Sequence, residues 1–269
     1  MRVLLLALLA TLLIPAETQT HRFTLANGLQ VVLLEAHEHP LVRARLHLAL
    51  TPEDRPEACP DLPERLQLLV NRGECADHKA SEFQRVLADR GIALKGTATA
   101  EGLDWRLLAR SRDQDQALGL LADLLLRPVL DPQGWPKPGG LSWDQLLVFR
   151  SRILNPRRAV LVLHGDLGLE QAKRLVLLSL GTWSGAALAQ GSPALASSSP
   201  EVRAMRRLLG EAGPFTQADL DLARSAWLGR QTLLSLEPEA QMAQALEEAL
   251  GLAPRWERMV ALTVDDLNR

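Results

Sequence analysis

Two histidines in a short polar segment have the spacing of a possible metal site. His37 and His39 flank Glu38, and Glu35 adds a carboxylate two residues before His37. In a strand or a turn, both imidazoles could point to the same side and bind a transition metal. A solvated polar turn explains the same residues. Both interpretations stay open on these residues alone.

The two cysteines, Cys59 and Cys75, flank a predicted helix. A disulfide between them is possible in an oxidising compartment. A helix of about a dozen residues is roughly 18 Å long, which works against a direct bridge unless the flanking segments fold back. Two free or buried thiols are therefore the favoured interpretation. A zinc site formed by these cysteines is the least favoured interpretation, because His78 is the only nearby histidine and the sequence has no CxxC pair.

The helix between the cysteines is predicted over residues 61–71, with Gly73 ending it. Its apolar residues recur at i, i+4, i+7 and i+8, and they are Leu62, Leu66, Leu69 and Val70. One face of the helix is therefore expected to be buried. Between these positions, Glu64, Gln67 and Leu68 supply a single carboxylate and no imidazole.

Strands and helices alternate around this helix. Asn27-Gly28 between two apolar runs predicts a hairpin over residues 21–35. Further strands are predicted over residues 41–50, 92–100, 103–109 and 159–164. Further helices are predicted over residues 81–91, 113–126 and 143–152, and from 167 to 180. Their predicted N-terminal caps are Ser81 (in a capping box with Gln84), Ser142 and Asp166.

The last third of the chain has a different pattern. Residues 186–200 are rich in Ala, Ser, Gly and Pro and are predicted to be a linker. From Glu201 onward the sequence predicts helices, with Thr216 and Thr263 as N-caps. A first part in which strands alternate with helices, followed by a part that contains only helices, predicts an α+β protein. The final helices must pack on the first domain's sheet or on a partner, and the sequence leaves this choice open.

The composition is that of an ordinary soluble globular protein. The 269 residues are 47% hydrophobic and 23% charged, with a formal net charge of −2. Aromatic residues make up only 4%, and no basic stripe is interleaved with them, so no nucleic-acid partner is predicted. The pairs Arg157-Arg158 and Arg206-Arg207 could face an acidic partner, but a solvated face is the simpler expectation for both.

The N-terminus has the pattern of a secretory signal. Arg2 precedes an apolar run over residues 3–14, which Pro15 and Ala16 follow. A membrane span needs about 20 apolar residues, so we interpret residues 1–16 as a cleaved signal peptide that leaves no stable membrane anchor. The mature protein is expected to be secreted, and periplasmic if the host is Gram-negative.

Four segments together resemble the insulinase/pitrilysin/processing-peptidase family of inverted HxxEH zinc metallopeptidases. They are a hairpin with F-x-L-x-N-G-L-x-V spacing at 23–42, a helix, strand pair and helix at 81–131, a strand ending in Gly-Asp at 141–185, and a helical finish at 213–269. The resemblance implies a metallopeptidase-like α/β sandwich over residues 21–185, with an antiparallel-rich sheet and helices on one face. It implies that residues 201–269 are a truncated, helical remnant of a second homologous domain, after the 186–200 linker.

The chain departs from this family where the chemistry should be. The resemblance places Glu64 and Leu68 at the two zinc-binding histidines of H-x-x-E-H and Gln67 at the catalytic glutamate. Gln cannot take a proton from water and Leu cannot bind a metal. The helix that should carry the third ligand is replaced by the short segment 131–140, and Tyr is absent from the chain. We therefore predict no catalytic residues, no metal or other cofactor, and no peptidase activity.

The predicted function is that of a secreted, catalytically inactive homologue that serves as the non-catalytic partner subunit of an active insulinase-type zinc peptidase. One alternative is a stand-alone module that binds extended peptides by adding a strand to its sheet. A second alternative is a zinc metalloendopeptidase with an unrecognised site, for which His37 and His39 are the candidates. In the resemblance these two residues lie at the variable, solvent-facing end of the first hairpin, which favours the polar turn.

Overall fold

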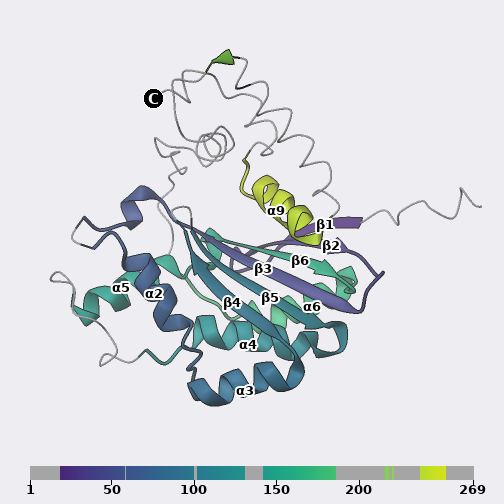
Figure 1. Cartoon of the computed structure of the whole chain (residues 1–269), viewed down its shortest axis with the longest axis horizontal. Helices are drawn as coiled ribbons and strands as arrows, with labels where there is room; N and C mark the ends of the chain where they lie inside the picture. The colour runs from purple at the N-terminus through teal and green to yellow at the C-terminus, as the bar shows by residue number, and fades with distance from the viewer. Residues whose placement is uncertain are drawn as a thin grey trace, which may run out of the picture.

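The computed structural model describes residues 19–57, 59–99, 102–130, 142–185, 216–217, 220 and 237–252. These residues confirm the predicted α+β class, with one six-stranded sheet and helices on both of its faces (Figure 1). The strands are β1 (Gln19–Thr24), β2 (Gln30–Glu35), β3 (Leu41–Ala49), β4 (Ala93–Ala98), β5 (Gly102–Arg110) and β6 (Ala159–Gly165). The α-helices are α2 (Leu62–Val70), α3 (Ala80–Arg90), α4 (Gln114–Leu126), α5 (Trp143–Ile153), α6 (Leu169–Leu180) and α9 (Pro238–Ala249). Short 3-10 turns are η2 (Pro52–Asp54), η3 (Ser111–Asp113) and η5 (Pro156–Arg158).

The sheet has the order β1-β2-β6-β3-β5-β4. All neighbouring strands are antiparallel except β2 and β6, which run parallel with Val32 opposite Val162. Strand β6 is buried over its whole length, which explains its continuously apolar sequence. The predicted hairpin is confirmed: Gly28 has φ 92°, and the Asn27 side chain donates to the carbonyls of Leu180 (2.8 Å) and Trp183 (3.0 Å).

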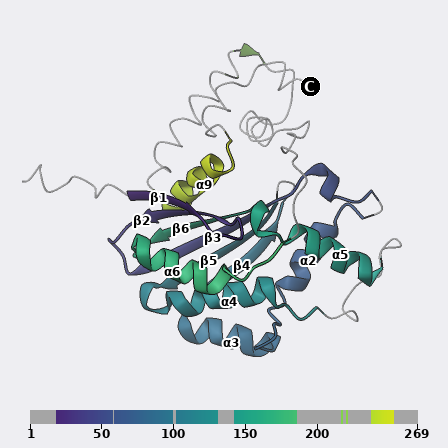
Figure 2. The ribbon, with the colours of Figure 1, turned by 180° about the vertical axis from the view of Figure 1, so that it is seen from behind.

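The main core lies between the sheet and the helices α2 to α6 (Figures 1 and 2). Its largest fully buried side chains include Trp105 on β5, Phe83 on α3 and Leu66 on α2. A second, smaller cluster on the opposite face joins Val32, Leu34, Val160 and Val162 to Met242, Ala245 and Leu246 of α9. Helix α9 therefore packs on the six-stranded sheet, over β2 and β6, a placement that the sequence left open.

The helix ends agree with the sequence in some places and not in others. Ser142 and Gln145 form a reciprocal capping box, and Gly91 closes α3 in a left-handed conformation, both as predicted. The prediction for Ser81 is wrong: α3 begins at Ala80 after Lys79, without a side-chain cap. Asp166 is also not a cap, because Gly168 is the N-cap residue of α6. The predicted signal peptide, the 186–200 linker, the Arg206-Arg207 pair and the Thr263 cap lie outside the described residues.

A buried ion cluster lies between β3 and β5. The Oδ1 atom of Asp104 lies 2.8 Å from Nε of Arg45 and 3.3 Å from Nδ1 of His47. His47 is thus a buried residue that is paired inside the fold. Burial opposes the ionisation of Asp104, but the hydrogen bonds from His47 and Arg45 outweigh it and lower its pKa from 3.8 to about 2.

Replacing Asp104 with asparagine is expected to lower the free energy of unfolding at pH 7 by about 2 kcal/mol. A carboxyl group with a depressed native pKa stabilises the fold above its unfolded pKa, and this contribution is lost as the pH falls. The difference between variant and wild type should therefore shrink from about pH 4 to pH 2. Urea unfolding at several pH values measures it, with the exposed Asp89→Asn as control. A difference that is constant with pH would contradict this assignment.

Candidate functional site

The three positions at which the resemblance expects zinc ligands and the catalytic base lie on α2. Pro63 occupies its first turn, where proline is well tolerated, and Asn71 is its C-cap residue. The predicted apolar face is confirmed, since Leu62, Leu66, Leu69 and Val70 are all buried. This packing fixes the direction in which Glu64, Gln67 and Leu68 project.

Glu64 is held by an arginine from the segment before the helix. Nη2 of Arg55 lies 3.0 Å from Oε1 of Glu64, and Nη1 lies 3.2 Å from Oε2. The same guanidinium donates to the carbonyls of Pro60 (2.7 Å) and Thr99 (2.8 Å). This is a two-pronged ion pair in which the carboxylate charge is already compensated. A metal ion at Glu64 would have to displace Arg55.

Gln67 is packed against the backbone of the edge strand β4. Its side chain is 2% exposed, and its Nε2 donates to Oδ1 of Asn71 at 3.1 Å. A Cβ atom added at Gly96 would lie 1.9 Å from Nε2 of Gln67 and 2.2 Å from Oδ1 of Asn71. Only glycine at position 96 lets α2 approach β4 this closely. Gln67 thus makes an interior contact between helix and sheet.

Leu68 faces away from this contact and is 69% exposed. It has no donor or acceptor atom in its side chain, so it cannot bind a metal or a water molecule. The three positions therefore have three different environments: an ion pair, a buried amide and an exposed apolar side chain. The structure does not bring them together as a metal site.

The neighbouring edge of the sheet is partly closed by the same helix. Strand β4 is the last in the sheet order, and Nδ2 of Asn71 donates to the Gly96 carbonyl at 2.9 Å. The Thr99 backbone N–H donates to the Gly102 carbonyl at 2.8 Å. Thr99 and Gly102, at the end of the β4–β5 ladder, are therefore a hydrogen-bonded pair. Since such pairs alternate along an antiparallel ladder, the backbone groups of Leu94, Gly96 and Ala98 point to the free edge. Asn71 therefore occupies one of the carbonyls that an added strand would use.

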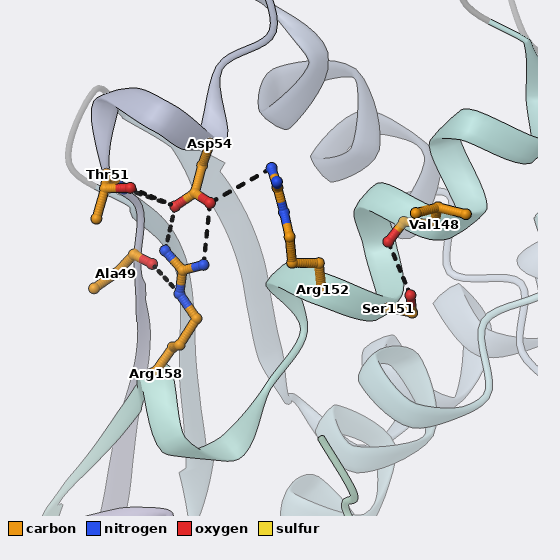
Figure 3. A network of polar contacts seen from close by, with 7 residues as sticks. All are labelled: Ala49, Thr51, Asp54, Val148, Ser151, Arg152 and Arg158. Carbon is orange, nitrogen blue, oxygen red and sulfur yellow. Dashed lines mark hydrogen bonds and ion pairs between the residues drawn. The ribbon is translucent and has the colours of Figure 1, made fainter. Parts of the chain in front are cut away.

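A second polar network holds the segment that carries Arg55 (Figure 3). Asp54 is 4% exposed and accepts hydrogen bonds from both terminal nitrogens of Arg158, from the Thr51 backbone N–H (2.8 Å) and from Thr51 Oγ1 (3.1 Å). Nε of Arg158 also donates to the Ala49 carbonyl at 3.2 Å, and Arg152 lies 3.6 Å from Asp54. Burial of Asp54 opposes ionisation, but the Arg158 and Thr51 hydrogen bonds outweigh it and lower its pKa.

This network corrects the expectation that the Arg157-Arg158 pair is solvated. The Arg158 side chain is only 13% exposed and connects η5 with η2, whereas Arg157 is exposed. Sequence reasoning missed the network because its members are 104 residues apart. The only local signal was the acidic pair Glu53-Asp54 directly after β3.

His37 lies beside two carboxylates, those of Asp166 and Glu35. Its Nδ1 lies 2.8 Å from Oδ1 of Asp166, and its Nε2 lies 3.8 Å from Oε2 of Glu35. The hydrogen bond with Asp166 raises the pKa of His37 and lowers that of Asp166. His39 is exposed at the surface. Among the described residues, no group of three or more His, Cys, Asp or Glu side chains is arranged to hold a metal ion.

Cys59 and Cys75 are both free and buried, which matches the favoured interpretation. Sγ of Cys59 donates to Oδ1 of Asp61 at 3.2 Å, and the Cys75 backbone bridges to His78 and Pro128. Burial raises the pKa of both thiols. They are therefore expected to stay protonated and unreactive near neutral pH. The segment predicted to replace the third-ligand helix lies outside the described residues.

The sequence matches no protein-family model and no curated protein. A protease from Helicobacter pylori has a similar structure, with a TM-score of 0.70 and 12% identity over 93% of this chain and 95% of that chain. The inactive domain of a peptidase M16 from Pseudomonas fluorescens has a TM-score of 0.68 and 14% identity over 93% of each chain.

The protein has a peptidase M16 fold. At these identities the likeness establishes the architecture, and it agrees with the insulinase-type fold that the sequence predicted. The similarity covers both compared chains nearly from end to end. No helix among the described residues is long and apolar enough to cross a membrane.

Proposed function

We propose that this chain is a catalytically inert M16-type domain that acts as the non-catalytic partner of an active zinc peptidase. One observation carries the proposal: the domain uses two of the three motif positions for its own internal contacts. Glu64 is paired with Arg55, and Gln67 is packed against Gly96. The third, Leu68, has no ligand atom.

Zinc hydrolysis of a peptide needs three protein ligands and a base that takes a proton from the bound water. Glu64 is one carboxylate, already in an ion pair, and Gln67 cannot accept a proton in place of a glutamate. The peptidase M16 domain of Pseudomonas fluorescens supports the proposal, because that domain has the same fold and is described as inactive. We propose that the partnership lies outside the cytoplasm, because the apolar run over residues 3–14 has the pattern of a secretory signal.

The test is purification of the tagged chain from the envelope fraction of its native host, with metal analysis on the same sample. We expect a second protein with an intact H-x-x-E-H sequence to co-purify in a ratio near one to one, and zinc to follow that protein. A parallel preparation of Asp89→Asn, which changes an exposed side chain on α3, controls for the tag and expression. Recovery as a lone, zinc-loaded peptidase would overturn the proposal.

The edge of β4 favours a second candidate function, the binding of extended peptides. Leu94, Gly96 and Ala98 present backbone groups there, and a cavity of about 210 Å³ lies beside them. The cavity is lined by Asn71, Phe83, Gln84, Leu87, Leu94, Lys95, Gly96 and Leu124. It is large enough for one side chain of an added strand. The Asn71 contact with Gly96 opposes this function, because it occupies an edge carbonyl.

Replacing Asn71 with alanine discriminates between the two functions. The variant frees the Gly96 carbonyl from its hydrogen bond with Asn71. If the edge of β4 binds peptides, the affinity for peptide should therefore rise about three- to tenfold, because one competing hydrogen bond is lost. Fluorescence anisotropy with a labelled, unstructured peptide library measures it, with the exposed Arg85→Ala as a control that leaves both Asn71 and the cavity lining in place. Absence of binding by wild type and variant alike would reject the peptide-binding alternative.

A further inference from the structure

The sheet face on the α9 side is covered only over β2 and β6 by described helices (Figures 1 and 2). The registers show which side chains of β3, β5 and β4 lie on the remaining part of that face. Successive side chains along a strand point to opposite faces of the sheet, so these residues alternate with the residues that point into the main core. On β3 they are Leu41, Arg43, Arg45, His47 and Ala49; on β5, Gly102, Asp104, Arg106, Leu108 and Arg110; on β4, Ala93, Lys95 and Thr97.

Three cations lie side by side in this set. Arg45 is directly opposite Arg106, and Arg106 is directly opposite Lys95. We name Arg45, Arg106 and Lys95 the basic row. Strands are about 4.8 Å apart, so the row crosses the sheet with one positive charge on each of three adjacent strands. Arg43 lies one step along β3, diagonal to Arg106.

Few carboxylates balance these charges. Asp104 is the one acidic residue of the set and is paired with Arg45 and His47, while Arg110 is paired with Asp113. Arg106 and Lys95 are exposed and make no ion pair with any described residue. Arg43 also has no carboxylate partner in the described part of the chain, and it helps burial to lower the pKa of His164 on β6.

Solvated surface cations are the simplest explanation for any one of these residues. Like charges directly opposite each other in a sheet, however, are destabilising, whereas opposite charges stabilise the sheet. Here Arg106 and Lys95 form such a pair on a face without a described helix, and neither has a described carboxylate partner, whereas the Arg45 charge opposite Arg106 is compensated by Asp104. An anionic surface lying on the basic row would turn this repulsion into attraction.

We propose that the basic row, with Arg43, is the docking surface for an acidic polypeptide segment. Carboxylates at i and i+4 on a helix are about 5–6 Å apart, close to the spacing of the row. Single-stranded nucleic acid would need aromatic side chains for stacking, and the set contains none. A membrane surface would need exposed apolar side chains, and Leu108, which is 37% exposed, is the one large apolar residue of the set that is exposed. The inference goes beyond the proposed function, since it does not depend on what the partner catalyses.

The test uses the full chain and a fluorescein-labelled, alanine-based helical peptide with Glu at every fourth position, in about 20 mM salt. We expect this peptide to bind at least about tenfold more tightly than its Gln counterpart, and binding to weaken in about 200 mM salt. The double variant Lys95→Glu with Arg106→Glu should lose at least about tenfold in affinity. The control Arg85→Glu with Arg174→Glu makes the same charge change on exposed helix positions and should change affinity less than about twofold.

A milder variant, Lys95→Gln with Arg106→Gln, keeps the test valid if charge reversal disturbs folding, and it should still lose several-fold in affinity. Equal binding of the Glu and Gln peptides would overturn the proposal. Equal losses of peptide affinity in the basic-row and control variants would overturn it as well, because they would show that binding depends only on the net charge of the protein. Tighter binding of a single-stranded oligonucleotide or of phosphatidylserine vesicles, lost in the basic-row variant, would reject a polypeptide partner.

Discussion

Replacing Asp54 with alanine is expected to lower the free energy of unfolding by about 3–5 kcal/mol, the cost of breaking a buried ion pair from one side. The substitution leaves Arg158 largely buried, with its guanidinium deprived of both carboxylate contacts. It also removes the acceptor for the Thr51 backbone N–H. Because Asp54 connects η2 with η5, the segment that carries Arg55 should loosen with it (Figure 3).

Urea unfolding monitored by circular dichroism measures this loss. Glu53→Ala is the matched control, because Glu53 lies in the same turn and is exposed, and it should cost less than about 0.5 kcal/mol. Since the native pKa of Asp54 is lowered, its contribution should be complete at neutral pH and should fall as the pH drops below the ordinary carboxyl range. An Asp54→Ala variant as stable as Glu53→Ala would show that the network contributes little.

Rebuilding the peptidase motif on α2 is expected to destabilise the protein without producing activity. The triple variant Glu64→His, Gln67→Glu and Leu68→His should lose about 2–4 kcal/mol of unfolding free energy. The Gln67→Glu change places a carboxylate in a 2% exposed position, where the amide oxygen already lacks a hydrogen-bond partner among the described residues. It also puts an acceptor against Oδ1 of Asn71, to which Gln67 now donates. Glu64→His further leaves Arg55 without its carboxylate.

The single variants separate these contributions. Gln67→Glu should carry most of the loss, and Leu68→His should be nearly neutral because Leu68 is 69% exposed. The triple variant is assayed for zinc by elemental analysis and for hydrolysis of a quenched fluorescent peptide. A stable triple variant that binds one zinc ion and cleaves the peptide would show that α2 still has the geometry of a working site.

Local patterns predicted the parts of the fold that depend on short-range chemistry. The Asn27-Gly28 turn, the apolar strand β6, the Ser142 cap and the buried face of α2 all follow from residues that are close in sequence. The failures involve competition from distant residues. Ser and Asp are residue types that favour the N-cap position. However, α3 begins one residue before Ser81, and Asp166 is hydrogen bonded to His37 instead.

The candidate site shows the same division. The absence of zinc ligands can be seen in the sequence, because ligand chemistry depends on residue type. What the altered residues now do could not be predicted, since Gly96 is 29 residues beyond Gln67 and looks like any glycine in a strand. Its close approach to α2 depends on the packing of helix against sheet. The basic row likewise needed the register of β3, β5 and β4, which a single sequence does not fix.

The measurement that tests the central claim most directly is the zinc content of the purified chain, determined together with its peptidase activity. We predict far less than one zinc ion per chain after dialysis against zinc-containing buffer, and no hydrolysis of a quenched fluorescent peptide. The internal contacts of Glu64 and Gln67, and the apolar side chain of Leu68, are the reason. Stoichiometric zinc, with hydrolysis that a chelator abolishes and zinc restores, would contradict the account.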